Sequence, residues 1–195
     1  PGENTPQNVQ VIIDEAGHLT GMVNDLLDIS KLQACVTQLN KTHFNLTANL
    51  EEAVQRIGRM ASANEFMIEL ICDHDKEVFV DADEFKIYQV VYNLINNALN
   101  YSGDSRHVTV RQECIGDTVK VSVQDFGLGI AKENLPLVWE RYYKIDKEHR
   151  RSFNGSGLGL AIVRKILELH NARYGVDSTL GQGSTFWFCL KVSDE

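Results

Sequence analysis

The sequence predicts an α+β fold, in which a two-layer α/β sandwich of mixed, largely antiparallel sheet carries helices on one face and is preceded by a long N-terminal helix. Segments with apolar residues three and four apart, typical of helices, are interspersed with segments in which every second residue is apolar, typical of strands. Their order follows no regular strand–helix–strand repeat, which disfavours a fully parallel sheet. With 195 residues, of which 43% are apolar, the chain is large enough for one ordinary domain and a small appendage.

A long helix is expected first, over residues 7–33. Its apolar positions follow heptad spacing and form a seam of Val9, Ile12, Ala16, Leu19, Val23 and Leu26. Because a seam of this length needs a second helix to cover it, we expect a partner helix from a missing part of the protein or from a second copy. A helix packed on its own domain is the alternative.

The remaining elements follow in chain order. Helices are expected at Asn49–Asn64, Glu84–Tyr101 and Leu158–His170. Strands are expected at His43–Leu46, Met67–Cys72, Val78–Val80, Val108–Glu113, Val119–Gln124, Tyr174–Asp177 and Ser184–Lys191. Turns at residues 73–75, 116–117 and 181–183 are expected to join successive strands, and residues 126–156 are expected to be rich in loops.

The composition limits the classes of function. A net charge of −8 argues against a nucleic-acid partner, whose phosphates need a basic surface. It does not argue against a nucleotide, because backbone N–H groups and Mg²⁺ can hold phosphates inside an acidic protein. No apolar run approaches the roughly 20 residues that cross a bilayer. The four widely spaced cysteines are expected to be free thiols in a reducing compartment.

Two carboxamides lie one turn apart on the helix expected over residues 84–101. Asn93, Asn97 and Tyr101 are four residues apart and therefore share one helix face. A buried amide without a partner costs roughly 1–3 kcal/mol. A carboxamide oxygen is also a suitable ligand for a partly hydrated Mg²⁺ that carries phosphate oxygens. A capping or structural amide is the alternative.

An acidic residue follows the strand expected over residues 119–124. Asp125, at the end of this strand, can accept a hydrogen bond from the exocyclic amine of adenine. Gly127 and Gly129 let the backbone approach a ring closely and turn sharply. The same Asp-x-Gly-x-Gly pattern also occurs in ordinary turns.

A third motif precedes the helix expected over residues 158–170. Gly155, Gly157 and Gly159 would present the N-terminal N–H groups of that helix to a phosphate, in a spacing that is neither a Walker loop nor a dinucleotide fingerprint. A basic cluster separates this motif from Asp125 and consists of Lys144, Lys147, His149, Arg150 and Arg151. We expect the cluster to belong to a lid over the phosphates, with a solvated charge run as the alternative.

These motifs, in this order, resemble the ATP-binding domain of sensor histidine kinases, in the wider group shared with Hsp90, gyrase B and MutL. The resemblance covers residues 42–192, and residues 24–32 are similar to the second helix of that family's dimerisation hairpin. It implies two parts, a partial dimerisation and phosphotransfer helix over residues 1–40 and an ATP-binding catalytic domain over residues 41–195.

The resemblance implies a role for each motif. Asn97 would ligate Mg²⁺ with Asn93 beside it, and Tyr101 would lie along the nucleotide. Asp125 would accept from the adenine amine and would be supported by a hydrogen bond from Thr185. The other nucleotide-binding residues would be Gly127 and Gly129 below the ring, Lys144 after the aromatic segment, and Gly155, Gly157, Leu158 and Gly159 at the phosphate end of the lid.

Departures from the family pattern refine the expected activity. ATP-hydrolysing members of the wider group carry a Glu general base where this chain has Asn93, which favours a kinase because an amide cannot take a proton. Asn100 and Lys144 replace the usual Lys and Arg, so contacts to the phosphates are expected to be weaker. Asn171 replaces a usual Gly and can adopt the same left-handed backbone. A nucleotide-binding module of a degenerate kinase and a related ATPase are the alternatives.

The histidine that accepts the phosphoryl group in the family has no counterpart among the six histidines of this chain. We therefore expect Mg-ATP to be positioned for transfer to a histidine outside the fragment, with no catalytic residue in this part. The expected partners are ATP, a response regulator and a second copy bound through the N-terminal helix. The expected location is the cytoplasmic domain of a membrane-anchored sensor.

Overall fold

The computed structural model describes residues 20, 23, 38–62, 65–73, 77–143 and 157–193. Thr20 and Val23 are helical, and the rest of the helix expected over residues 7–33 lies outside the described residues. Lys144, Gly155 and the whole basic cluster also lie outside them.

The helices and strands come in the following order. The strands are β1 (Thr42–Asn45), β2 (Met67–Cys72), β3 (Phe79–Ala82), β4 (His107–Ile115), β5 (Thr118–Asp125), β6 (Arg173–Thr179) and β7 (Gly183–Lys191). The helices are α2 (Leu46–Ala61), α3 (Glu84–Tyr101) and α4 (Gly159–Leu169), with a short 3-10 helix, η2, at Gly103–Ser105.

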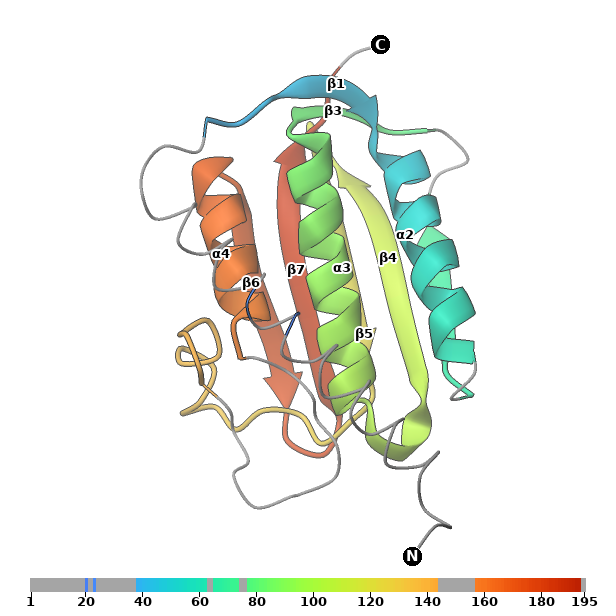
Figure 1. Ribbon diagram of the computed structural model, residues 1–195, viewed down its shortest axis with the longest axis vertical. Coiled ribbons are helices and arrows are strands. Elements are labelled where there is room, and N and C mark those ends of the chain that lie inside the picture. The colour runs from blue at the N-terminus through green and yellow to red at the C-terminus, as the bar shows by residue number, and fades with distance from the viewer. Residues whose placement is uncertain are drawn as a thin grey trace, which may run out of the picture.

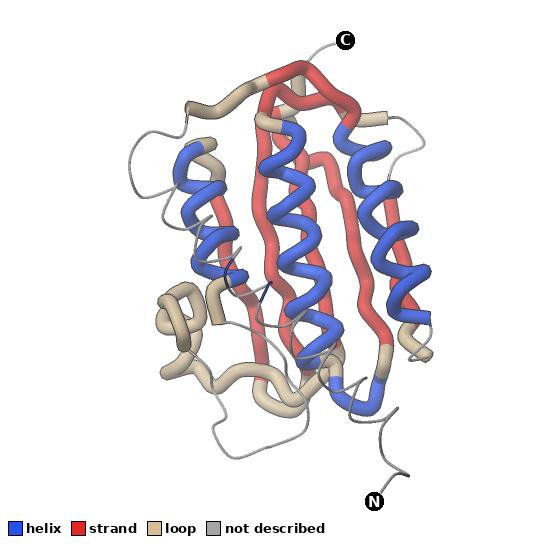
Figure 2. The backbone as a smooth tube through the Cα atoms, in the orientation of Figure 1, coloured by secondary structure: helices blue, strands red, loops and turns tan. Residues whose placement is uncertain are grey.

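The described part of the chain forms two layers (Figures 1 and 2). One layer is a five-stranded sheet in the order β2–β4–β5–β7–β6, in which β2 runs parallel to β4 and the other neighbours are antiparallel. The helices α2, α3 and α4 cover one face of this sheet, with α3 over its centre. β1 and β3 pair at one end of the molecule. The predicted α+β sandwich is confirmed.

The core lies between this sheet and the helices. Apolar residues alternate along the two central strands, and the buried ones are Val119, Val121 and Val123 of β5 and Phe186, Phe188 and Leu190 of β7. Since successive side chains of a strand point to opposite faces, odd residues of β5 and even residues of β7 face the helices. This parity places Asp125 and Ser184 on the helix-covered face.

The strands expected on either side of residues 73–75 are present as β2 and β3, but they are not partners of each other. β2 pairs with β4, and β3 pairs with β1. The predicted pairings across residues 116–117 and 181–183 are confirmed. The helix expected from Asn49 begins earlier, at Leu46, because the Asn45 side chain caps it by accepting the N–H of Ala48 at 3.0 Å.

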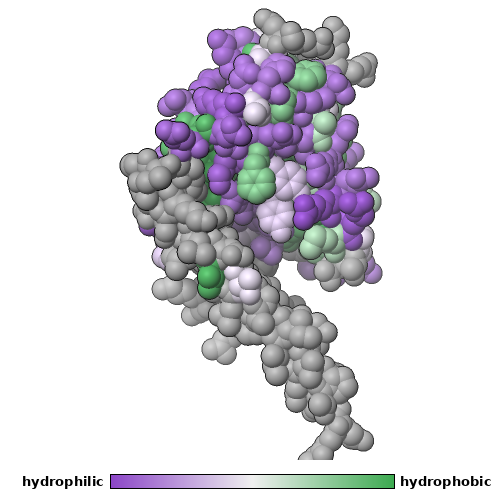
Figure 3. Space-filling view, turned by 45° about the horizontal axis from the view of Figure 1, so that its top comes forward, coloured by the Kyte–Doolittle hydropathy of each residue, from purple (hydrophilic) through white to green (hydrophobic). Residues whose placement is uncertain are grey.

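On the face shown in Figure 3, the described residues are mainly hydrophilic, with hydrophobic residues scattered among the polar ones. None of the helices in the described ranges is both long and apolar enough to cross a membrane. The three described cysteines, Cys72, Cys114 and Cys189, are free.

His170 joins the end of α4 to the start of α3. Its Nδ1 lies 2.8 Å from the carbonyl oxygen of Ile166, which requires a proton on Nδ1, and its Nε2 accepts the N–H of Asp83 at 3.0 Å. Only the neutral ring makes both bonds. Burial lowers the pKa of His170, and Lys41 lowers it further, while the Ile166 bond and Asp83 oppose this shift. Asn171, which follows, has a φ of 55°, as predicted.

We expect the free energy of unfolding to decrease as the pH falls below about 6.5. The folded-state pKa of His170 lies below its ordinary value of 6.5, so the unfolded chain binds more protons between the two values. The stability is fully present above that window and is lost as the pH falls toward the folded-state pKa. Urea unfolding at several pH values checks this. His170→Gln keeps an acceptor but does not titrate, and should lose less stability on acidification than wild type.

His43→Gln is the matched control, because His43 is an exposed histidine on β1 that bonds Asp81 rather than Asp83. This variant should keep the part of the pH dependence that comes from His170. If the free energy of unfolding of His170→Gln depends on pH as that of wild type does, the hydrogen bonds of His170 do not control stability in acid.

Candidate functional site

The two predicted asparagines and Tyr101 lie in α3, whose bounds agree with the prediction. Asp83 starts this helix as its N-cap, since its side chain accepts the N–H of Lys86 at 3.1 Å. A helix rises 1.5 Å per residue, so Asn93 and Tyr101 are separated by about 12 Å along the axis, with Asn97 midway. Asn93 and Asn97 are half-buried and Tyr101 is exposed.

The start of α4 lies against Asn93. A Cβ atom built on Gly159 would stand 3.4 Å from Asn93 Oδ1, so this amide oxygen faces the first turn of α4. No side-chain hydrogen bond of the described structure caps α4, and its first turn carries no acidic residue. The positive end of the helix dipole is therefore directed toward the Asn93 amide. Gly157, which leads into α4, has a φ of 72° and so needs the freedom of glycine.

The loop after β5 lies against the other end of α3. A Cβ atom on Gly127 would stand 1.7 Å from the carbonyl oxygen of Tyr101, so only glycine fits between this loop and the helix. The N–H of Gly127 donates to Asp125 Oδ1 at 3.0 Å. Asp125 is therefore tied to the end of α3 through one intervening glycine.

These two contacts lie on either side of Asn97 along the axis of α3. The α4 start meets the helix at Asn93, and the loop that holds Asp125 meets it near Tyr101, about 12 Å further on. Among the predicted site residues, Gly159 contacts Asn93, and Gly127 contacts both Tyr101 and Asp125. Asn97 lies between the two contacts on α3, and Gly157 and Leu158 lead into α4. Gly129 lies against the turn between β6 and β7.

Asp125 is a buried carboxylate, 1% exposed. Burial raises its pKa above the ordinary value, whereas hydrogen bonds from the backbone of Gly127 and from the backbone and hydroxyl of Ser184 act in the opposite direction. A buried charge is tolerated only where such donors surround it. The arrangement holds a hydrogen-bond acceptor at the end of β5.

The prediction that Thr185 supports Asp125 is wrong by one residue. Asp125 pairs with Ser184 across β5 and β7, whereas Thr185 pairs with Gln124 on the opposite face of the sheet. The alternation of buried residues at Phe186, Phe188 and Leu190 already indicates which residues of β7 face the helices, and Ser184 follows this alternation. That signal could have identified Ser184 from the sequence.

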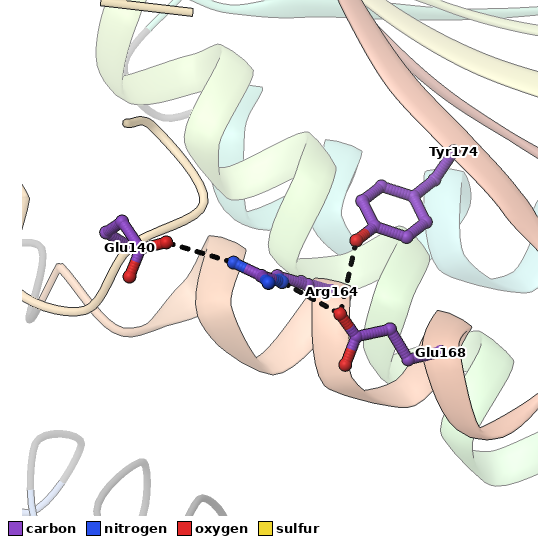
Figure 4. Close-up of polar contacts among 4 residues, drawn as sticks. All are labelled: Glu140, Arg164, Glu168 and Tyr174. Carbon is purple, nitrogen blue, oxygen red and sulfur yellow. Dashed lines mark hydrogen bonds and ion pairs between the residues drawn. The ribbon is translucent and has the colours of Figure 1, made fainter. Parts of the chain in front are cut away.

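Trp139 and Glu140, which follow β5 in the chain, contact α4 and the sheet. Arg164 of α4 donates to Glu168 at 2.8 Å and to Glu140 at 3.0 Å, and the Tyr174 hydroxyl points toward Glu168 (Figure 4). Trp139 packs edge-on against Tyr174 and Phe186, with ring centroids 5.0 and 5.6 Å away. Trp139 is thus held on the sheet and Glu140 on the middle of α4.

Tyr142 and Gly157, which lie on either side of residues 144–156, are in contact. The N–H of Tyr142 donates to the carbonyl oxygen of Gly157 at 2.9 Å. Tyr142 has a φ of 60°, an unusual conformation for a residue with a side chain. The predicted positions Lys144 and Gly155 fall within the range that this contact closes.

Comparison with known proteins identifies the class. Residues 82–194, more than half of the chain, match the family described as histidine kinase-, DNA gyrase B- and HSP90-like ATPase, and the chain belongs to this family. Among curated relatives, the sensor histidine kinase WalK of Bacillus subtilis is 33% identical over 97% of this chain. The chain spans 31% of the length of that relative.

Solved structures share the fold. Full-length ShkA in complex with AMPPNP matches with a TM-score of 0.82 and 24% identity, over 99% of this chain and 40% of that chain. The histidine kinase ThkA in complex with the response regulator protein TrrA matches with a TM-score of 0.78 and 23% identity, over 99% of this chain and 53% of that chain. The predicted resemblance to the ATP-binding domain of histidine kinases is confirmed.

Proposed function

We propose that this chain is the ATP-binding catalytic domain of a sensor histidine kinase, which positions Mg-ATP for transfer of the γ-phosphoryl group to a histidine outside the chain. The main support is that the α4 start meets the Asn93 side chain and the Asp125 loop meets the backbone of Tyr101, two points of α3 that lie about 12 Å apart along its axis. Family membership and the likeness to WalK support the same function.

The adenine end of the proposed site is at Asp125. Its carboxylate accepts a hydrogen bond from the exocyclic amine of adenine, with Gly127 and Gly129 below the ring and Tyr101 along the nucleotide. Guanine carries a carbonyl oxygen where adenine carries this amine. Two acceptors facing each other would be unfavourable, so the site selects adenine.

The phosphate end of the proposed site is at Asn97 and the start of α4. Asn97 ligates Mg²⁺ through its amide oxygen, with Asn93 beside it, while Gly157, Leu158 and Gly159 place the positive end of α4 near the phosphates. These residues fit Mg²⁺, because Asn93 Oδ1 already faces the α4 start and Mg²⁺ prefers oxygen ligands. Bound Mg²⁺ would neutralise phosphate charge. Lys144 and Gly155 would contact the phosphates from the lid.

No group of three or more His, Cys, Asp or Glu side chains suited to a metal occurs in the described ranges. Mg²⁺ would therefore be held only together with the phosphate oxygens and water, as is usual for Mg²⁺ at nucleotide sites. Metal binding should depend on nucleotide.

Transfer to another group is favoured over hydrolysis. Asn93 faces the α4 start at the place where a general base would activate water, and an amide cannot take a proton. The chain would contribute position and charge neutralisation, while the accepting imidazole nitrogen supplies the electron pair for the new P–N bond and ADP leaves. The phosphoryl group would then pass to an aspartate of a response regulator.

The proposal extends to the whole protein. Residues 1–40 would be part of a dimerisation and phosphotransfer domain and residues 41–195 the catalytic domain. A homodimer would form through the N-terminal helix, and the intact protein would be a membrane-anchored sensor with this part in the cytoplasm. ThkA has been solved with a response regulator protein, which supports such a partner here.

Asn97→Ala is the variant that tests the metal end of the site. It should weaken the affinity for Mg-AMPPNP about tenfold, the equivalent of one lost ligand interaction of ~1.4 kcal/mol, and should reduce the dependence of binding on Mg²⁺. Calorimetric titration with and without Mg²⁺ measures both. Asn96→Ala is the control, since Asn96 faces a groove between α2 and α3 with Tyr92 and Leu99. Equal effects of the two variants would remove Asn97 from the site.

The reaction itself is tested by adding ATP and a separate fragment that bears an acceptor histidine helix. Formation of phosphohistidine on that fragment supports the kinase. Nucleotide binding without transfer would identify a binding module, and steady release of phosphate would identify an ATPase. Failure of the wild-type chain to bind Mg-AMPPNP would contradict all three.

A further inference from the structure

Ser178 of β6 lies at the centre of a set of hydrogen bonds next to the candidate adenine site. Its Oγ accepts the N–H of Ile130 at 2.8 Å. The same Oγ lies 2.8 Å from the carbonyl oxygen of Gly183 and 3.1 Å from Ser184 Oγ. Neither Ser178 nor Ser184 was identified by the sequence motifs.

These contacts lead directly to Asp125. Ser178 pairs with Ser184 across β6 and β7, and Ser184 pairs with Asp125 across β7 and β5. The three side chains therefore form one row across three neighbouring strands, on the face that the helices cover. Ser184 lies directly opposite Asp125 on the neighbouring strand, and its hydroxyl and backbone lower the pKa of the Asp125 carboxyl.

Each serine hydroxyl has one proton to donate, and this limits which way the hydrogen bonds can run along the row. Ser178 Oγ accepts a hydrogen bond from Ile130 N–H, and its own hydroxyl proton can be donated either to Ser184 Oγ or to the Gly183 carbonyl oxygen. When Ser178 donates to Ser184, the single proton of Ser184 is directed to Asp125. Hydrogen bonds in such a chain strengthen one another in a poorly hydrated interior.

Ser178 also fastens the loop that follows Asp125. The loop is held at Ile130 by Ser178, and at Leu128 by the N–H of Gly181, which donates to the Leu128 carbonyl oxygen at 2.6 Å. Between these points, a Cβ atom on Gly129 would stand 2.1 Å from the carbonyl oxygen of Thr179. The turn between β6 and β7 therefore sets the position of the loop.

We propose that Ser178 is a positioning residue for adenine recognition, which orients the Ser184 hydroxyl toward Asp125 and fixes the loop beneath the base. The inference rests on the proposed function, because it assigns both serines to that nucleotide site. Through this row, Ser178 keeps Asp125 an ionised acceptor for the amine of the base. A purely structural serine would affect stability but would not affect the ionisation of Asp125.

The test is the affinity of the full chain for Mg-AMPPNP as a function of pH. Ser178→Ala should weaken binding about five- to tenfold near neutral pH, as expected for one lost hydrogen bond in the row. Binding in this variant should also be lost at a higher pH on acidification, because the Asp125 carboxylate loses an oriented donor and protonates more readily. Ser178→Thr, which keeps the hydroxyl, should restore both.

Ser122→Ala is the matched control, since Ser122 is a buried serine of β5 on the opposite face of the sheet and pairs with Trp187. It should leave both the affinity and the pH profile unchanged. Ser178→Cys should have the same effects on binding as Ser178→Ala, because a thiol is a weak donor and acceptor. The cysteine side chain also fills more of the space that the serine occupies. It replaces the alanine variant if that variant does not fold.

The outcomes separate the inference from the proposed function. If the wild-type chain binds Mg-AMPPNP and the Ser178 variant binds with the same affinity and pH profile, the inference is overturned and the proposed function stands. Weaker binding with an unshifted pH profile would make Ser178 a structural residue and would also overturn it. No binding by the wild-type chain overturns both.

Discussion

Asp125→Asn should abolish tight binding of adenine nucleotides and leave the domain folded. The asparagine amide keeps the shape of the carboxylate but replaces one acceptor oxygen with a donor that would face the adenine amine. Loss of a hydrogen bond to a charged group costs about 1.5–3 kcal/mol, which corresponds to a roughly 10- to 150-fold weaker affinity. Calorimetric titration with Mg-AMPPNP measures this change.

The same substitution should raise the stability of the nucleotide-free protein at neutral pH. The pKa of Asp125 is raised by burial, so its ionised form is less favourable in the folded chain than in the unfolded chain. The folded chain therefore binds more protons, and stability is lost as the pH rises through the folded-state pKa. A neutral amide avoids this loss. Thermal unfolding without nucleotide should show a higher midpoint for Asp125→Asn.

Asp81→Asn is the control for both measurements, because Asp81 lies on β3 and is 66% exposed. It should change neither the affinity nor the unfolding midpoint substantially. Weak binding by Asp125→Asn together with a lower midpoint would indicate damage to the fold rather than loss of an acceptor. Unchanged affinity would exclude Asp125 from base recognition.

Local signals explain why α3 was predicted with its observed bounds. Asp83 is a strong N-cap residue, and its side chain does accept the N–H of Lys86. The apolar residues of the helix recur with helical spacing, and those that face the core are fully buried, as at Val90, Leu94 and Ile95. Asn93, Asn97 and Tyr101 are four residues apart, so the sequence also predicted that they share one face of this helix.

The pairing of β2 and β3 could not be predicted in this way. Alternation of apolar residues identifies a strand but contains no information on its neighbour. β2 lies parallel to β4, which follows it only after the whole of α3, and β3 pairs with β1, which precedes α2. Such pairings depend on contacts between segments far apart in the sequence.

The error at Thr185 has a different origin. Side chains alternate along a strand, so a shift of one residue moves a predicted contact to the other face of the sheet. The family resemblance placed the support for Asp125 at the correct end of β7, and the parity of the buried residues on β7 was needed to choose between Ser184 and Thr185. Ser178 carries no motif signal, since its role depends on its register with Ser184.

Gly127→Ala should have the largest effect on stability of any single methyl addition near the site. The new Cβ atom would stand 1.7 Å from the carbonyl oxygen of Tyr101 and 2.8 Å from its carbonyl carbon, both backbone atoms. Either the end of α3 or the loop must move, at a cost of roughly 3 kcal/mol, the upper part of the range for overpacking. Movement of the loop would also break the bond from Gly127 N–H to Asp125, so nucleotide affinity should fall with stability. Urea unfolding and titration with Mg-AMPPNP measure the two effects.

Alanine variants of two other glycines distinguish the effect of the Gly127–Tyr101 contact from the ordinary effects of adding a methyl group. Gly58 lies within α2, and a Cβ atom added there would meet no other atom within 4 Å, so Gly58→Ala should stabilise the domain by about 1 kcal/mol through helix propensity alone. Gly116 also has open space but a φ of 64°, so Gly116→Ala should cost about 1 kcal/mol through backbone strain alone. Of these three variants, only Gly127→Ala should combine a large loss of stability with a loss of nucleotide affinity, because its added atom separates α3 from the loop that holds Asp125.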